Sequence, residues 1–176
     1  MHKVIVFREK KLRMLMTYLI KLADENDIKD VFDLSNDDEV RKNSINQGKI
    51  QWENHVNWYS TKIKDKNCKF YIIRDENNDF IGQMRIDSKD NENIISISIK
   101  KEFRGNGLAP KILSDCIKKS NLRNFDAYIK PENIASIKSF IHAGFKYKCD
   151  YMENTLLLKK YILEIKESRI LNNNIF

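Results

Sequence analysis

The sequence predicts a single mixed α/β domain, and three observations lead to that fold class. Segments with the period of two that half-buried strands show alternate with segments whose apolar residues recur every three or four positions, as in helices. The connections between these segments are short, and 176 residues are enough for about one domain. Five glycines and two prolines are too few for a fibrous or linker-dominated chain. We therefore expect helices packed against one sheet.

The first half of the chain supplies one strand and three helices. The expected elements are a strand over 17–23, helices from 24, over 37–42 and over 51–64, and a loop over 43–50. Asp24 is a suitable N-cap for the first helix, because Ile28, Val31 and Phe32 follow it with helical spacing. The last of these helices carries an apolar stripe of the same spacing, formed by Trp52, Val56, Tyr59 and Ile63.

The second half of the chain alternates strands with two further helices. We expect strands over 68–74, 80–88, 94–100, 125–130, 145–150 and 153–160, and helices from 108 and over 132–143. The turn sequences D-E-N-N-D and K-D-N-E-N separate the first three of these strands, so these strands are expected to form hairpins. Pro131 ends one strand, and Gly144 suits the left-handed end of the last helix.

The chain is expected to divide into a basic leader over 1–16, a domain over 17–160 and a tail over 161–176. The net charge is +7, but the first thirteen residues carry five basic side chains against one acidic. Residues 159–176 carry four basic side chains against two acidic. Because little excess charge remains in the domain, it lacks the basic face of a nucleic-acid-binding protein, and we expect no nucleic-acid partner.

Composition also bears on the cellular compartment. No apolar run approaches the ~18 residues that a membrane-spanning helix needs, and the N-terminus lacks the features of a secretory signal. Cys68, Cys116 and Cys149 match neither a disulfide framework nor a zinc-binding pattern. We therefore expect a cytoplasmic protein with no membrane partner and no metal, whereas its oligomeric state stays open.

The stretch with the most chemical information joins the strand over 94–100 to the following helix. It reads R-G-N-G-L-A, from Arg104 to Ala109. Glycines let a ligand approach the backbone closely, and the first turn of a helix presents unpaired N–H groups that attract anions. Arg104 can add a forked cationic contact. The turn has neither the glycine pattern of dinucleotide sites nor that of triphosphate-binding loops, and alone it could be structural punctuation.

A second motif downstream changes the interpretation of this turn. The order R-x-x-G-x-A is followed, after a helix and a strand, by N-x-x-S-x-x-x-F-x-x-x-G-F, formed by Asn133, Ser136, Phe140, Gly144 and Phe145. Together these motifs resemble the GNAT family of acetyl-CoA-dependent N-acetyltransferases, over about residues 18–160. The resemblance implies the GNAT fold, a central mixed, mostly antiparallel sheet of about six to seven strands flanked by helices.

The resemblance also implies where acetyl-CoA, the acetyl donor, would bind. The backbone amides of the glycine turn would hold the pyrophosphate, and one strand would lend its backbone to the pantetheine arm, beside a β-bulge. The second motif would approach the thiol end, although Asn133 could equally be a helix cap. The implied donor-binding residues are Ile97, Ser98, Ile99, Arg104, Gly105, Asn106, Gly107, Leu108, Ala109, Asn133 and Ser136.

A narrower resemblance concerns the acceptor. The stretches V-R-K-N-S-I-N at 40–46, W-E-N-H-V-N-W-Y at 52–59 and N-C-K-F-Y-I at 67–72 are similar to a bacterial subgroup that acts in sugar-nucleotide pathways. This similarity implies an amino group on a nucleotide-activated sugar as the acceptor. The polar and aromatic candidates for binding it are Arg41, Asn43, Trp58, Gln83, Arg85 and Asp87. Surface and core roles for these side chains remain open alternatives.

The acid and base of the reaction are less well indicated. Many family members carry a tyrosine four residues before the G-F pair, where it protonates the departing thiolate, but this chain has Phe140 there. Tyr128 and Tyr147 are possible substitutes. Glu92 and His55 are the candidate bases. The alternative for Glu92 is a solvent-exposed carboxylate without a catalytic role, and the alternative for His55 is a histidine buried in the core.

Two other functions remain open on the sequence alone. An acetyltransferase for peptide or protein N-termini, of the type that modifies ribosomal proteins, would need a wide and preferably acidic groove. A catalytically silent acyl-CoA-binding module is the other alternative, for which Phe140 is the only hint.

Overall fold

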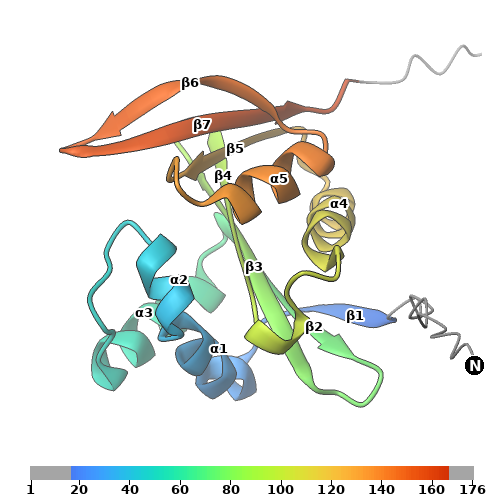
Figure 1. The fold of residues 1–176 in the computed structure, drawn as a ribbon. Coiled ribbons are helices and arrows are strands. Elements are labelled where there is room, and N and C mark those ends of the chain that lie inside the picture. Colours follow the sequence, from blue (N-terminus) through green and yellow to red (C-terminus); the bar gives the residue numbers. More distant parts are fainter. Residues whose placement is uncertain (1–16, 167–176) are drawn as a thin grey trace, which may run out of the picture.

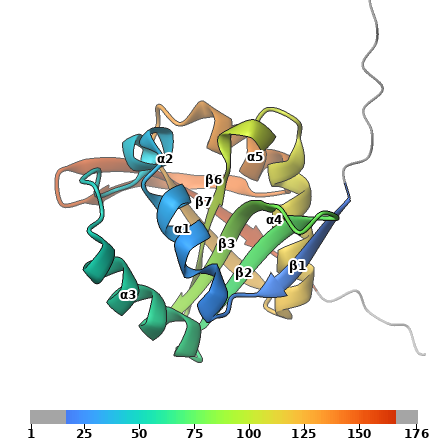
Figure 2. The same ribbon diagram turned by 90° about the horizontal axis from the view of Figure 1, so that it is seen from below.

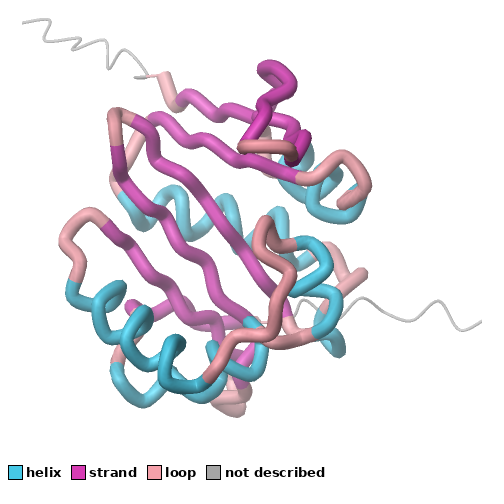
Figure 3. Tube along the Cα trace, turned by 90° about the vertical axis from the view of Figure 1, so that its left-hand side faces the viewer, coloured by secondary structure: helices cyan, strands magenta, loops and turns pink. Residues whose placement is uncertain are grey.

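The computed structural model describes residues 17–166, which form one seven-stranded sheet with helices on both faces (Figures 1 and 3). The strands are β1 (Tyr18–Leu22), β2 (Cys68–Asp75), β3 (Phe80–Lys89), β4 (Glu92–Ile99), β5 (Asn124–Ile129), β6 (Lys146–Glu153) and β7 (Leu156–Glu164). Their order across the sheet is β1-β2-β3-β4-β5-β7-β6. Every neighbouring pair is antiparallel except β4 and β5, which are parallel. The predicted mixed, mostly antiparallel sheet is thereby confirmed.

Two groups of helices cover the two faces of the sheet (Figure 2). The helices are α1 (Ile28–Ser35), α2 (Asp38–Asn43), α3 (Trp52–Lys64), α4 (Leu108–Ser120) and α5 (Ile134–His142), with short 3-10 turns at Glu25–Asp27 and Lys101–Phe103. Helices α4 and α5 share a large apolar core with β2 to β5, which contains Ile112, Leu113 and Phe140. On the other face, Val31 of α1 and Tyr59 of α3 belong to a smaller core. The sheet therefore separates two packed layers.

Local sequence signals explain where several elements begin and end. Asp24 forms the predicted N-cap as a reciprocal capping box with Asp27, which starts the 3-10 turn before α1. Asp37 caps α2 by accepting a hydrogen bond from the N–H of Val40. Gly144 follows α5 with a φ of 96°, a left-handed conformation that glycine adopts without steric cost.

Strand β7 ends at Glu164, beyond the predicted domain limit at residue 160. Its last residues pair with the first residues of β5, for example Leu163 with Phe125. The domain therefore extends through the end of β7. The predicted leader over 1–16 and the tail from 167 onward lie outside the described residues.

The parallel strands β4 and β5 diverge, and this divergence positions the site. They share the single register pair Ile94 and Asp126, near the start of both strands. From there the strands separate toward their carboxyl ends (Figure 1). A parallel pair normally continues its evenly spaced hydrogen bonds, so the early end of pairing leaves backbone groups of both strands facing a gap.

None of the helices within residues 17–166 has both the length and the apolar character needed to span a membrane.

Candidate active site

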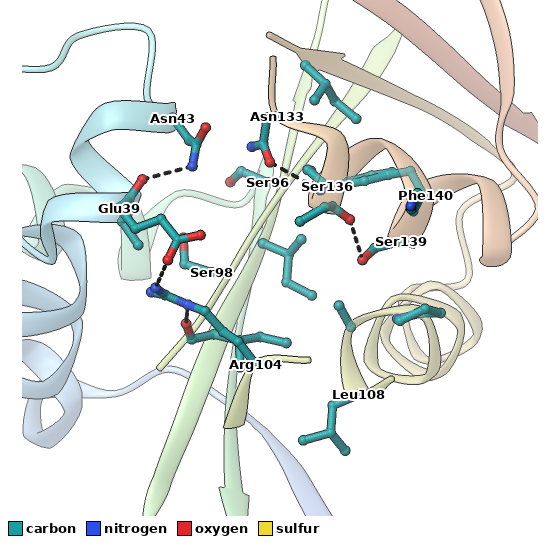
Figure 4. Close-up of a pocket in the computed structure, with 18 of the residues that line it drawn as sticks. Glu39, Asn43, Ser96, Ser98, Arg104, Leu108, Asn133, Ser136, Ser139 and Phe140 are labelled. Atoms are coloured by element: carbon teal, nitrogen blue, oxygen red, sulfur yellow. Dashed lines mark hydrogen bonds and ion pairs between the residues drawn. The ribbon is translucent and has the colours of Figure 1, made fainter. Parts of the chain in front are cut away.

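A cavity of about 540 Å³ lies where β4 and β5 diverge. Its walls come from five parts of the fold: α2, β4, the turn that leads into α4, the end of β5, and α5 (Figure 4). Hereafter we call this cavity the cleft. Its size is in the range of small-molecule sites, and its position at the ends of two separating parallel strands is a common location for such sites.

The glycine turn before α4 forms one end of the cleft. Gly105 and Gly107 both line it and have φ of 77° and 72°, in the left-handed region that disfavours other residues. No atom lies within 4 Å of a Cβ built on either glycine, so the space beside the turn is open. No side chain caps the start of α4, so the N–H groups of its first turn can receive an anion. The predicted phosphate cradle is therefore geometrically available.

Arg104 is placed beside this turn but is not free. Its Nε donates to the carbonyl of Ile99 at 2.7 Å, and its two terminal nitrogens bind Glu39 at 2.7 Å and Asp37 at 2.8 Å. Burial raises the pKa of Asp37, but the hydrogen bond and charge of Arg104, together with hydrogen bonds from the N–H groups of Val40 and Glu39, hold that pKa below its usual range. Arg104 thus fixes α2 to the turn, an arrangement that the sequence analysis did not anticipate.

Strand β4 forms the floor of the cleft. The predicted residues Ile97, Ser98 and Ile99 all line it. Gly82 on β3 allows the close approach of this strand, because a Cβ at position 82 would lie 2.4 Å from the carbonyl oxygen of Ser98. Of the other predicted donor-binding residues, Leu108 and Ala109 also line the cleft, whereas Asn106 is exposed outside it.

Helix α5 forms the opposite wall. Asn133 is its N-cap and accepts a hydrogen bond from the N–H of Ser136 at 3.1 Å through Oδ1. Both residues also line the cleft, so the cap role and the predicted ligand role are compatible (Figure 4). Phe140 is buried and its ring packs edge-on against Phe145. A phenyl ring offers no proton to a leaving group.

Helix α2 closes the side of the cleft, but the predicted roles of its residues need correction. Asn43 lines the cleft as expected. Arg41 does not, because its guanidinium donates to the carbonyls of Asn46 and Gly48 and to the hydroxyl of Ser44. These bonds hold the loop after α2 in place. Arg41 is therefore a scaffold residue of the loop in this structure and not a phosphate ligand.

His55 and Trp58 also lie away from the cleft. His55 is 1% exposed, and its Nε2 is 3.0 Å from the carbonyl oxygen of Ile28. Burial lowers the pKa of this imidazole. Trp58 packs against Phe70 and supports Arg85 on its ring face. The prediction of His55 as a base and Trp58 as a sugar contact is therefore corrected: both belong to the packing of α3. Conversely, Trp52, which belongs to the predicted apolar stripe of this helix, is exposed.

The three polar residues of β3 lie on the face of the sheet that α3 covers. Arg85 donates to Asp87 at 2.6 Å, and Lys62 of α3 binds the other oxygen of Asp87 at 2.7 Å. Burial would raise the pKa of Asp87, but the charges and hydrogen bonds of Arg85 and Lys62 keep it below its usual range. Gln83 is partly buried and has an unpaired Oε1. None of the three residues lines the cleft, so direct substrate contact is not supported for them.

Glu92 stands at the start of β4, at the far end from the glycine turn. Its carboxylate accepts hydrogen bonds from Lys160 at 2.6 Å and from Tyr128 at 3.0 Å. The hydrogen bond from Lys160 is the main reason that the pKa of Glu92 lies below its usual range. A carboxylate with a lowered pKa is a weak base, and Glu92 does not line the cleft. Tyr128 does line it and is the link between the two.

Several cleft residues were missed by the sequence analysis, among them Glu39, Ser96 and Lys130. Ser96 lines the floor, next to the predicted Ile97. Lys130, directly after β5, lines the cleft although it is only 2% exposed. A lysine before a proline carries no signal of burial in the sequence, because lysine is almost always exposed. Within residues 17–166, no group of three or more His, Cys, Asp or Glu side chains is placed to hold a metal ion.

Comparison with known proteins agrees with the fold. A family model described as acetyltransferase (GNAT) domain matches residues 17–146. Spermidine N-acetyltransferase from Vibrio cholerae, solved with CoA and spermine, has a TM-score of 0.76 at 15% identity, covering 84% of this chain and 95% of that chain. Comparison with curated protein sequences finds no match.

Two further solved structures share the fold. The aminoglycoside acetyltransferase AAC(6')-Ib, solved with coenzyme A and kanamycin, has a TM-score of 0.71 at 14% identity, covering 84% of this chain and 95% of that chain. A domain from Methanocaldococcus jannaschii has a TM-score of 0.69 at 23% identity, covering 85% of this chain and 99% of that chain.

Proposed function

The chain belongs to the GNAT family of acetyltransferase domains, and on that premise we propose that its acceptor is a primary amine on a nucleotide-activated amino sugar. The protein is an acetyl-CoA-dependent N-acetyltransferase. The finer assignment is supported by the similarity of residues 40–46, 52–59 and 67–72 to the sugar-nucleotide subgroup, and by the charge of the cleft.

The donor would occupy the part of the cleft next to α4. Its pyrophosphate fits the open space beside Gly105 and Gly107, where uncapped N–H groups and the positive end of α4 are available. Its pantetheine arm would follow Ile97 to Ile99 along β4, which stays paired with β3 but no longer pairs with β5 beyond Ile94. This path leads toward Ser136 on α5, where the thioester would meet the acceptor.

The observation that carries the acceptor proposal is the charge of the cleft. Glu39 is the only acidic side chain among the described residues that line it, and Arg104 already binds that carboxylate at 2.7 Å. A polyamine or an aminoglycoside carries several positive charges, which need free carboxylates. By contrast, the cleft offers Ser96, Ser98 and Asn43, which suit hydroxyl groups. A polar, uncharged or anionic amine therefore fits better than a polycation.

The chemistry would depend mainly on positioning. The neutral amine attacks the thioester carbonyl, a C–N bond forms and the C–S bond breaks, and the proton that the amine nitrogen loses is taken up by the departing thiolate. Phe140 provides no proton, and His55 and Glu92 lie outside the cleft. Holding two reactants at attack distance can supply ~7–11 kcal/mol of the barrier. The walls formed by β4 and α5 are the groups that would hold them.

The proposal is tested by a substrate panel. Release of free thiol from acetyl-CoA is followed with UDP-linked amino sugars, spermidine, kanamycin and peptides with free N-termini. We expect turnover of a UDP-amino sugar at a kcat/KM at least tenfold above that of spermidine and kanamycin. Efficient acetylation of peptides without turnover of any sugar would replace the proposed acceptor with a peptide N-terminus and leave the donor unchanged.

A further inference from the structure

Lys130 is a charged residue of the cleft that is buried without a partner of opposite charge among the described residues. It is 2% exposed, and its Nζ donates one hydrogen bond, 2.9 Å to the carbonyl of Lys42 at the end of α2. Within residues 17–166, no carboxylate lies in ion-pair distance of this ammonium group. Burying a charge without a partner of opposite sign is costly, and an ammonium group has three protons to donate.

The other fully buried charge of the domain shows the contrast. Asp27 is 1% exposed and is paired with two cations, Lys21 at 2.8 Å and Arg74 at 2.8 Å. The fold therefore compensates that buried charge with its own side chains. Lys130 receives only a backbone carbonyl, and it borders a cavity. The missing negative charge can be supplied by a ligand.

The direction of the Lys130 side chain indicates whether the ligand is the donor or the acceptor. Along β5, Phe125, Ala127 and Ile129 face the large core under α4 and α5. Because side chains alternate across a sheet, the next residue, Lys130, faces the opposite layer, as its bond to α2 confirms. The glycine turn leads into α4, so the phosphate cradle of the donor belongs to the layer that Lys130 faces away from.

We propose that Lys130 is a specificity-determining residue whose ammonium group binds an anionic group, a phosphate or a carboxylate, carried by the acceptor. This inference rests on the proposed function for its reaction, but it does not require that the acceptor be a sugar. In the buried environment of the cleft, a pair between Lys130 and the ligand is screened much less than at the surface. An acceptor without the anion would leave the charge unpaired and would bind more weakly.

A purely structural role is the competing explanation, in which Lys130 only ties the end of β5 to the last carbonyls of α2. The variant Lys130→Met separates the two, because it removes the charge and keeps most of the side-chain volume. Lys42→Met is the matched control: it removes one positive charge from an exposed side chain nearby and leaves the Lys42 carbonyl in place.

The binding test uses UDP as a probe, with CoA at saturation so that the donor site is filled. We expect Lys130→Met to weaken UDP binding at least tenfold by calorimetry, about 1.4 kcal/mol. Lys42→Met should leave the affinity within twofold and the melting temperature unchanged. In a protein that acetylates UDP-amino sugars, unchanged UDP affinity in a folded Lys130→Met variant would overturn the proposal.

A second test compares each of two anionic acceptors with its neutral counterpart, and it distinguishes a failure of the Lys130 proposal from a failure of the sugar proposal. One pair is a UDP-amino sugar and its neutral methyl glycoside; the other is an amino acid and its methyl ester. Wild-type protein should prefer the anionic member of at least one pair tenfold in kcat/KM, and Lys130→Met should abolish that preference. If only the amino acid pair reacts, and its anionic member is preferred by the wild type but not by Lys130→Met, the sugar acceptor is excluded and the role of Lys130 is supported.

Two results would overturn the proposed role of Lys130 without overturning the proposed function. If the UDP-amino sugar and its methyl glycoside react equally well and the amino acid pair shows no preference either, a sugar acceptor survives and the inference fails. If Lys130→Met does not fold, the wild-type preferences decide, because a wild-type protein that does not distinguish the members of either pair has no anion-binding lysine in its acceptor site.

Discussion

Individual charged residues around the cleft differ chiefly in whether the protein has already paired them. Asp87 and Glu92 are held by neighbouring cations, and Arg104 is held by two carboxylates of the α2 segment. Lys130 has no such partner among the described residues. Because a paired group is costly to redirect, the unpaired groups and the bare N–H groups of the glycine turn are the better candidates for ligand contact.

The glycine turn gives the most direct prediction at this scale. Gly107→Asp places a negative charge in the space proposed for the pyrophosphate, so the affinity for CoA should fall at least tenfold, about 1.4 kcal/mol, in calorimetry. Gly107→Asn is the matched control, because asparagine has the same shape without the charge and tolerates a φ of 72° better than most residues. We expect its loss of affinity to be clearly smaller. If both folded variants bound CoA with the wild-type affinity, the turn would be excluded as the phosphate site.

Glu92 gives a prediction about pH. Its pKa is lowered in the folded protein, chiefly by Lys160, so its stabilising contribution is present above the unfolded value of about 4.3 and is lost as the pH falls through the lower folded value. Glu92→Gln should therefore lower the melting temperature by a few degrees at pH 7, with a difference that shrinks below about pH 4.3.

The same variant tests catalysis. Glu92 does not line the cleft, so we expect kcat to change less than tenfold and the pH–rate profile to keep its shape. A hundredfold loss of kcat at unchanged melting temperature, with one apparent pKa missing from the profile, would restore Glu92 as the base.

At the scale of elements, the site depends on how α2 is attached to the rest of the fold. The ion pairs from Arg104 to Asp37 and Glu39 join α2 to the glycine turn. Arg104 and Glu39 are 65 residues apart in the sequence. Lys130 joins α2 to the end of β5. The helix that borders the acceptor side is thus connected to both diverging strands through side chains of the cleft.

This attachment leads to a prediction for donor binding. If Arg104 contacts the donor's phosphates as the sequence predicts, Glu39 competes with them, and it is largely exposed, where an ion pair contributes ~0.2–1 kcal/mol. Glu39→Gln should therefore raise the affinity for CoA by up to about fivefold, as this range converts. Glu53→Gln, on an exposed turn of α3, serves as the charge-matched control and should have no effect. A decrease in CoA affinity in Glu39→Gln would show that Arg104 must stay on α2 to support the site.

At the scale of the whole molecule, periodicity and turn residues were sufficient to locate all seven strands along the chain, but not to give their order across the sheet. Gly144 and Asp24 ended and started helices as predicted, because caps are local interactions between neighbouring residues. The glycine turn was also predictable, since the left-handed backbone at Gly105 and Gly107 favours glycine. These features depend on sequence distances of a few residues.

The acceptor side was much less predictable for a physical reason. His55 has the residue type of a base, but its role is set by Ile28, 27 residues away, whose carbonyl oxygen lies near its Nε2. Arg41 has the type of a phosphate ligand, but the loop that follows uses its guanidinium. Lys130 has the type of a surface residue but is buried by tertiary packing. Pairing between distant segments decides these roles, and no local pattern encodes it.

The end of the domain supplies the last prediction. Strand β7 lies between β5 and β6, and its final residues include Tyr161, which is buried in the large core and pairs with Ala127. A chain that ends after Lys160 loses this tyrosine and the pairing of Ile162 and Leu163 with β5. Removing a large buried side chain costs ~3–5 kcal/mol, which is a substantial part of the stability of a small domain.

We therefore expect truncation after Lys160 to abolish cooperative thermal unfolding or to lower the melting temperature by about 6–20 °C, given ~2–4 °C per kcal/mol for a domain of about 150 residues. Truncation after Lys166 keeps every described residue of β7 and is the control, with a melting temperature within a few degrees of the full chain. Circular dichroism melts of the two truncated chains measure the difference. Equal melting temperatures would mean that the last turn of pairing between β5 and β7 contributes little, and that the domain limit at residue 160 predicted from the sequence is sufficient for folding.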